Sequence, residues 1–242
     1  GSRLFPLTKA INKHLLNVYD KPLFYYPLSN ILLAGINDIS IVIDEKDYPD
    51  YLLYKKYFKS FNINIDLVIQ QKPLGILDAV KLVFRTYKSV KSFIIILGDN
   101  FFYGESLPKI IKNALDSKSN TIFSYFVKNP EEYGILNNEK IIEKPQKPKS
   151  NLAVTGMYIY LRNSVTYSKK PKISIRGEYE ITDLNNILLQ KKLLKVIELG
   201  RGVVWLDAGS PERLINTSQF VNMVEKRQGL KVACIEEIAL FN

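Results

Sequence analysis

Short apolar segments typical of β-strands alternate with segments of helical periodicity along the first half of this 242-residue chain. Strands are predicted over residues 39–43, 65–69, 93–97 and 121–127. Helical spacing occupies the intervals between them, over residues 48–58, 77–87 and 107–115. Alternation of this kind is typical of a parallel sheet with helices on both faces, so the chain is predicted to adopt a doubly wound α/β fold.

The pattern changes after residue 129. Short strands are predicted over residues 140–143 and 153–161, and the Lys/Pro-rich segment 144–149 between them suits a lid or a substrate-side subregion. Helices follow over residues 180–190 and 211–224, the second with Ser210 as its N-cap. No repeat or boundary divides the sequence, so we expect residues 1–242 to form a single domain.

The amino-acid composition limits the classes of binding partner that the chain can have. An excess of 34 Lys and Arg over 24 Asp and Glu gives a net charge of +10, which attracts nucleotides, sugar phosphates or nucleic acid. The basic residues are scattered and form no nucleic-acid-binding module, so we expect no nucleic-acid partner. The single cysteine, Cys234, excludes an internal disulfide and fits the reducing cytoplasm. No apolar run has membrane-spanning length, so we expect no membrane association.

Two carboxylates follow apolar strands. Asp99 comes after the strand at 93–97, within a turn flanked by Gly98 and Gly104, and Asp207 comes after the apolar run 203–206. A carboxylate beyond the carboxyl end of a strand can hold Mg²⁺ against the phosphates of a nucleotide. The alternative is an Asp-Asn turn that only ends the strand, because both residues are common turn formers.

Several motifs, which follow one another in a fixed order, cover nearly the whole chain. They are RLFPLTK from Arg3, YDKP from Tyr19, YYPLS from Tyr25, LGDNFFYG from Leu97, EKP from Glu143, RGE from Arg176, EITD from Glu180, WLD from Trp205 and RQGLK from Arg227. In this set the chain resembles the glucose-1-phosphate thymidylyltransferases. The resemblance implies a Rossmann-like mixed sheet of the nucleotide-diphospho-sugar transferase type, with an inserted sugar-binding subregion. It also implies transfer of a thymidylyl group from dTTP to glucose 1-phosphate by direct displacement, with release of pyrophosphate.

The resemblance implies roles for individual residues. Asp99 and Asp207 match the carboxylates that hold Mg²⁺. Arg3, Lys13 and Lys144 match catalytic cations that hold phosphates. For Arg3 and Lys13 the alternative is a solvated surface charge. The nucleotide-binding positions are Gly1, Ser2, Gln70, Pro73, Gly75 and Asp99. The sugar-phosphate-binding positions are Tyr133, Gly134, Glu143, Lys144, Val154 and Arg176.

Gln70 has a further property of its own. Its amide offers both a hydrogen-bond donor and an acceptor, which suits an imide base edge. Asp78 stands nearby in the sequence, where relatives commonly carry an amide. A change of this kind can alter base or sugar selection.

The sequence departs from the family at both ends. Arg3 is preceded only by Gly1 and Ser2, so we expect this chain to lack the family's first strand and most of its phosphate loop, leaving the neighbours of that strand unpaired. The helical tail of relatives beyond the region of Glu236 is also expected to be missing. A homo-oligomer is expected.

Two other functions stay open: a UTP-using sugar-1-phosphate uridylyltransferase, and a non-catalytic nucleotide or sugar-phosphate binder. A basic nucleic-acid-binding protein is a third hypothesis, based on charge alone.

Overall fold

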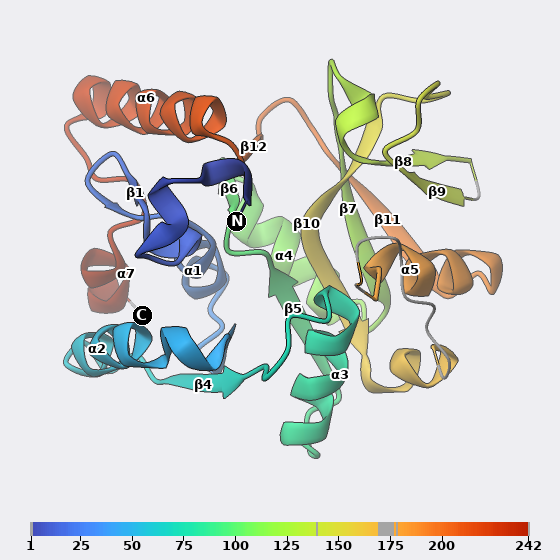
Figure 1. Ribbon diagram of the computed structural model, residues 1–242, viewed down its shortest axis with the longest axis horizontal. Coiled ribbons are helices and arrows are strands. Elements are labelled where there is room, and N and C mark those ends of the chain that lie inside the picture. The colour runs from blue at the N-terminus through green and yellow to red at the C-terminus, as the bar shows by residue number, and fades with distance from the viewer. Residues whose placement is uncertain (1, 139, 169–176, 178, 242) are drawn as a thin grey trace.

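A computed structural model describes residues 2–138, 140–168, 177 and 179–241, arranged as a mixed α/β structure (Figure 1). The strands are β1 Asn17–Val18, β2 Lys21–Pro22, β3 Ile39–Ile43, β4 Ile65–Ile69, β5 Ser92–Ile96, β6 Asn100–Tyr103, β7 Asn120–Phe126, β8 Gly134–Asn137, β9 Lys140–Glu143, β10 Leu152–Leu161, β11 Leu194–Leu199 and β12 Val204–Asp207. The helices are α1 Tyr25–Leu33, α2 Tyr48–Lys59, α3 Ile76–Thr86, α4 Leu107–Asp116, α5 Ile181–Gln190, α6 Pro211–Gln228 and α7 Ile235–Phe241. The predicted α/β class is confirmed.

The largest sheet has six strands and is mixed, where alternation alone predicted a parallel one. Strands β11, β7, β10, β8 and β9 follow one another in that order, and β5 also pairs with β10. Strand β11 runs parallel to β7, whereas β10 runs antiparallel to β7, β8 and β5. Because β10 has ten residues, its second half pairs with β5 and its first half reaches β8. The long antiparallel strand therefore joins β5 and β7 to the β8–β9 pair.

Three two-stranded sheets complete the framework of described strands, and in one of them β1 pairs antiparallel with β2. Strands β3 and β4 are parallel, and β6 pairs antiparallel with β12. Among the strands that the structure describes, β3 has only β4 as a partner and β5 has only β10. All five residues of β5 are half-buried, although four of them are Phe or Ile. Each of these two strands thus keeps one edge without a described strand beside it.

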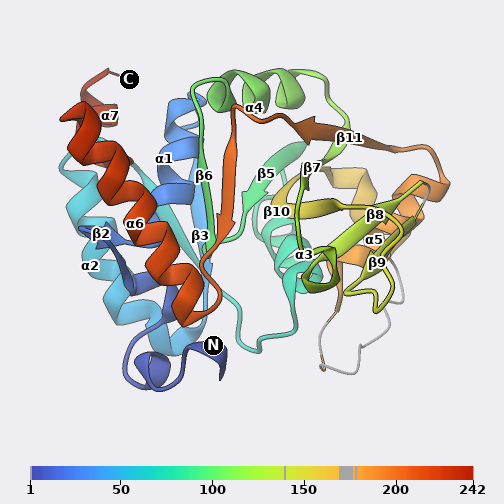
Figure 2. The same ribbon diagram turned by 90° about the horizontal axis from the view of Figure 1, so that it is seen from above.

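Helices cover the sheets on both sides, and α1, α2, α6 and α7 gather on one side of the molecule (Figure 2). Aromatic residues fill the core there: Phe24 lies 5.5 Å from Tyr51 and 6.2 Å from Phe58, measured between ring centroids. Helix α6 begins as the sequence predicts, because the Ser210 side chain accepts a hydrogen bond from the Arg213 amide. It ends at Gln228, and the C-cap Gly229 has a φ of 70°, in the left-handed region.

No helix in the described part of the chain is both long and apolar enough to cross a membrane.

Candidate active site

Asp99 and Asp207 meet where β6 and β12 pair. In that antiparallel pair Asp207 is opposite Asn100, and the Ala208 amide donates to the Asp99 carbonyl at 2.8 Å. Two carboxylates that are more than 100 residues apart in sequence thus come to one end of a two-stranded ladder. The negative charge of Asp99 contributes to raising the pKa of Asp207, as expected for close like charges.

A lysine neutralises the first of these carboxylates. The Lys13 Nζ lies 2.6 Å from Asp99 Oδ2. Burial alone would raise the pKa of Asp99, but the charge of Lys13 and the hydrogen bonds from Lys13 and Asn100 hold it at about 2. The ring of His14 packs on Gly98, where an added Cβ would lie 3.0 Å from the ring. Burial, aided by the charge of Lys13, lowers the pKa of His14 to about 4, so this histidine is neutral at pH 7.

Asp207 has a different environment. The Tyr133 hydroxyl donates to Asp207 Oδ1 at 3.0 Å, and the Arg213 guanidinium contacts Oδ2 and also Glu132. Burial raises the pKa of Asp207 to about 6, and the charge of Asp99 adds to this shift, while Tyr133 and Arg3 oppose it. Arg3 lies beside the same carboxylate, because a Cβ at Gly209 would be 3.4 Å from Asp207 Oδ2 and 3.5 Å from Arg3 Nη2. Because the pKa of Asp207 is raised, a further cation that approaches this side chain would stabilise its ionised form.

Asn100 connects the elements that carry the two carboxylates. This residue is 4% exposed; its Oδ1 accepts from the Gly156 amide at 3.0 Å and from Trp205 Nε1 at 2.7 Å, and its Nδ2 donates to Asp99 Oδ1 at 2.9 Å. Gly156 has to be a glycine here, since a Cβ would lie 2.5 Å from the Asn100 Cγ. The network fixes the Asp99 carboxylate relative to β10 and β12.

The expected sugar-side residues that the structure describes lie on β8, β9, the turns next to them and, for Val154, β10. Gly134 is opposite Glu143 in the β8–β9 pair, and a Cβ on Gly134 would lie 3.0 Å from Glu143 Oε2. Lys144 is exposed and has a φ of 44°, the left-handed region that non-glycine residues seldom adopt. Its amide donates to the Tyr133 carbonyl at 2.9 Å, so the strained turn is attached to the residue that contacts Asp207. Val154 is half-buried within the packed sheet.

The expected base-side residues follow β4. Gln70 continues from that strand, its amide donating to the Ile43 carbonyl at 2.8 Å. Gly75 precedes the first residue of α3 with a φ of 94°, and Pro73 is exposed between them. The Gln70 carboxamide contacts Asp78 in the first turn of α3. The contact between Gln70 and Asp78 therefore joins the two ends of this loop.

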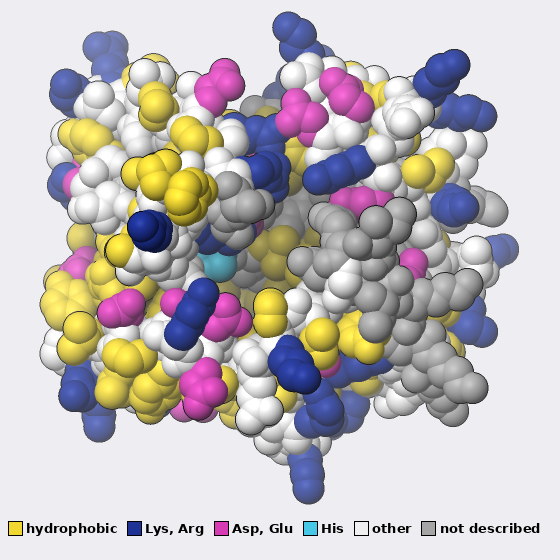
Figure 3. Space-filling model, viewed as in Figure 1, with side chains coloured by type: hydrophobic (Ala, Val, Ile, Leu, Met, Phe, Trp, Pro, Cys, Tyr) yellow, Lys and Arg dark blue, Asp and Glu magenta, His cyan; other side chains and the backbone are white. Residues whose placement is uncertain are grey.

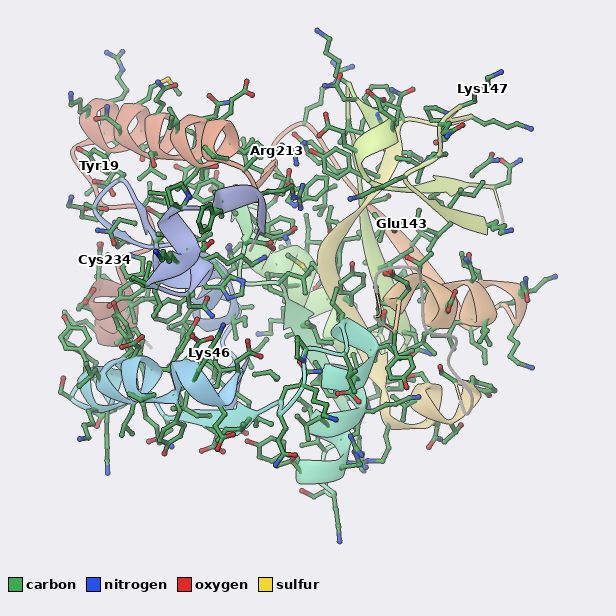
Figure 4. All side chains as sticks on the ribbon, in the orientation of Figure 1. Tyr19, Lys46, Glu143, Lys147, Arg213 and Cys234 are labelled. Carbon is green, nitrogen blue, oxygen red and sulfur yellow. The ribbon has the colours of Figure 1, made fainter. Side chains whose placement is uncertain are left out.

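The face drawn in Figure 3 is hollowed between the two halves of the molecule, and Lys and Arg side chains gather along the rim of the hollow. In Figure 4, Arg213 reaches this region from α6, while Glu143 approaches from the opposite half on β9. Arg213 therefore brings a cation to this region from one half, and Glu143 brings a carboxylate from the other.

The structure brings Arg3, Lys13, Asp99, Tyr133 and Asp207 together, while Gln70, Pro73 and Gly75 form a separate loop. Gly1 and Arg176 lie outside the described residues, and Ser2 begins the short helical turn Ser2–Leu4. Sequence reasoning did not assign roles to four residues that shape this site: Asn100, Glu132, Trp205 and Arg213. The one signal for Trp205 and Asn100 was their place inside the motifs that contain Asp207 and Asp99.

The donor set limits the metal that could bind. Within the described residues no group of three or more His, Cys, Asp or Glu side chains could hold a metal ion. Two carboxylates suit Mg²⁺, which keeps several waters and takes substrate phosphate oxygens as its remaining ligands. The residues present therefore fit a cation shared with a nucleotide, and they do not fit a closed structural site.

This fold and this site define a nucleotidyltransferase: the chain belongs to the nucleotidyl transferase family, whose model matches residues 1–223. The relatives that match this chain carry the name of one particular nucleotidyltransferase. It is 42% identical to the glucose-1-phosphate thymidylyltransferase of Neisseria meningitidis serogroup A, over 100% of this chain and 86% of that protein. It is 40% identical to the enzyme of that name from Mycolicibacterium smegmatis, over 99% of this chain and 85% of the relative.

Solved structures agree with the fold. A structure from Bacillus anthracis, described as that of a glucose-1-phosphate thymidylyltransferase in complex with sucrose, superposes with a TM-score of 0.79 at 32% identity, covering 90% of each chain. A UDP-glucose pyrophosphorylase complexed with UDP-glucose superposes with a TM-score of 0.76 at 24% identity, covering 94% of this chain and 95% of that one. The second likeness concerns the fold alone.

Proposed function

We propose that this protein transfers a thymidylyl group from dTTP to glucose 1-phosphate, giving dTDP-glucose and pyrophosphate. The observation that carries the proposal is the convergence of Asp99 and Asp207 with Lys13 and Arg3. The chain's full-length similarity to glucose-1-phosphate thymidylyltransferases supports the choice of substrates.

The reaction is a direct displacement. An oxygen of the sugar phosphate attacks the α-phosphorus of dTTP, and the bond from that phosphorus to the bridging oxygen of pyrophosphate breaks. The demand on the protein is to position two anions and to neutralise the charge of the leaving pyrophosphate. Arg3 supplies a planar guanidinium and Lys13 a point charge for the triphosphate. We assign Lys144 and Arg176 to the sugar phosphate, and Tyr133, Gly134, Glu143 and Val154 to the sugar.

Asp99 and Asp207 are the residues that would hold Mg²⁺. When bound, the ion would supply positive charge to the phosphate oxygens. Lys13 pairs with Asp99 at 2.6 Å. A cation at Asp99 would satisfy that carboxylate, so the Lys13 ammonium would be free to contact phosphate. Neutral His14, packed on Gly98, holds the turn that carries Asp99 without adding charge.

The test is pyrophosphate release from dTTP and glucose 1-phosphate in the presence of Mg²⁺. We expect release by the protein and a loss of at least about 10²-fold in kcat for Asp207→Asn, since removing one electrostatic partner of a transition state typically costs that much. Asp116→Asn, an equal charge change at the exposed end of α4, is the matched control and should keep full activity.

Each alternative outcome has a distinct meaning. A folded protein that is active with UTP but not with dTTP would be a uridylyltransferase. Thermal stabilisation by nucleotide without pyrophosphate release would identify a non-catalytic binder. No stabilisation and no release would contradict the proposal outright.

A further inference from the structure

The carboxamide of Gln70 is held by two groups that accept hydrogen bonds. Its Nε2 donates to Asp78 Oδ2 at 2.8 Å and to the Gly75 carbonyl at 3.3 Å. Both partners belong to the start of α3, where Gly75 precedes the helix and Asp78 lies in its first turn. Gln70 itself is half-buried at the end of β4.

Chemistry permits only one orientation of this amide. A backbone carbonyl and an ionised carboxylate accept hydrogen bonds and cannot donate them. If the amide turned over, Oε1 would face two acceptors and both contacts would become repulsive. An amide in place of Asp78 could turn with Gln70 and donate to it, so the carboxylate is what removes the choice.

Asp78 is itself held in place. Its other oxygen, Oδ1, lies 3.8 Å from Arg85 Nη2, about two helical turns further along α3. The first turn of a helix also favours a negative charge, since the free amides of the helix point there. The side chain is 20% exposed, which leaves the contact with Gln70 partly shielded from water.

The Gln70 carboxamide can therefore offer a ligand only a hydrogen-bond acceptor, its oxygen Oε1. No described residue donates to Gln70 Oε1, while both Nε2 hydrogens are used within the loop. We propose that Asp78 locks Gln70 as a pure acceptor, so that the base site selects nucleobases with a ring N–H, as in thymine and uracil, against cytosine. The inference rests on the proposed function, which places the base at Gln70. It makes Asp78 a positioning residue that acts through Gln70.

The selectivity follows from the base edge. Thymine and uracil carry a hydrogen on N3, which Oε1 can accept. Cytosine has a lone pair at N3, so the same oxygen would meet an acceptor, and a buried acceptor without a partner is costly. Discrimination of this kind is strong because the wrong base leaves a polar group unpaired.

The experiment compares dUTP with dCTP, which differ only at this edge, as substrates with glucose 1-phosphate and as ligands in calorimetry. For Asp78→Asn we expect the dUTP/dCTP ratio of kcat/KM, and the matching ratio of affinities, to fall at least about tenfold. The fall should come mainly from better use of dCTP, because the freed amide can turn its NH₂ toward N3. Asp116→Asn should leave the ratio unchanged.

A double variant separates positioning from general damage. Gln70→Ala should also lower the ratio, and adding Asp78→Asn to it should change the ratio no further. A merely structural role for Asp78 would weaken dUTP and dCTP equally. The inference is overturned if Asp78→Asn keeps the ratio within about twofold of wild type, or shifts it equally without Gln70. Absence of turnover with dTTP would instead refute the proposed function, and the affinity ratios would still decide the role of Asp78.

Discussion

Gly156→Ala tests whether the Asn100 network organises the centre of the protein. The added Cβ would lie 2.5 Å from Asn100 Cγ, whereas ordinary contact begins near 3.4 Å, so the amide has to retreat by about 0.9 Å. The Gly156 amide now donates to Asn100 Oδ1 at 3.0 Å, and Trp205 Nε1 donates to the same oxygen at 2.7 Å. A shift of that size breaks the first bond and misaligns the second.

The cost can be worked from these contacts. Overpacking of a rigid core costs about 1–3 kcal/mol, and each hydrogen bond lost from a buried amide costs about 1 kcal/mol. Together the change should lower the free energy of unfolding by roughly 3–5 kcal/mol. For a chain of this length that is a fall in Tm of at least about 6 °C.

Urea denaturation and thermal melting are the assays. Gly200→Ala is the control, since Gly200 is exposed and an added Cβ there meets nothing within 4 Å. We expect the control to stay within about 0.5 kcal/mol of wild type. If Gly156→Ala costs less than about 1 kcal/mol relative to that control, with an unchanged m-value, the steric argument is refuted.

Three further predictions concern the same region. Trp205→Phe keeps an aromatic ring but removes the bond from Nε1 to Asn100 and leaves a cavity in the core, which together should cost at least about 1 kcal/mol in chemical denaturation; an unchanged midpoint would speak against that bond. Because the folded-state pKa of Asp99 lies below its ordinary value, its ionised form stabilises the fold above about pH 4, and this stabilisation is lost as the pH falls toward 2. Lys13→Gln should raise that pKa and move the acid-unfolding midpoint to higher pH, and a midpoint at or below that of wild type would contradict the pairing. Tyr133→Phe removes the hydrogen bond that lowers the pKa of Asp207, so carboxyl NMR titration should place that pKa above about 6, and a fall would be the contrary result.

The sequence by itself determined the local structure of this protein. Strands β3 and β4 have the predicted boundaries, and the start of α6 at Pro211 follows from Ser210 and Pro211. These features depend on interactions between neighbours in the chain: apolar periodicity, capping side chains and the fixed φ of proline. The motifs around Asp99 and Asp207 were visible for the same reason, since each is a strand followed by a turn.

Only the tertiary structure decided which distant groups meet. The alternation of strands and helices could not predict the antiparallel direction of β10, because it does not indicate between which strands, or in which direction, a later strand pairs. Asn100 with Trp205, and Arg213 with Glu132, are contacts across 105 and 81 residues that no local pattern encodes. Gln70 was expected to offer both a donor and an acceptor, and the fold leaves it one, because Asp78 and Gly75 take its hydrogens. The free energy of these contacts comes from burial and charge in three dimensions, so they exist only once the chain has folded.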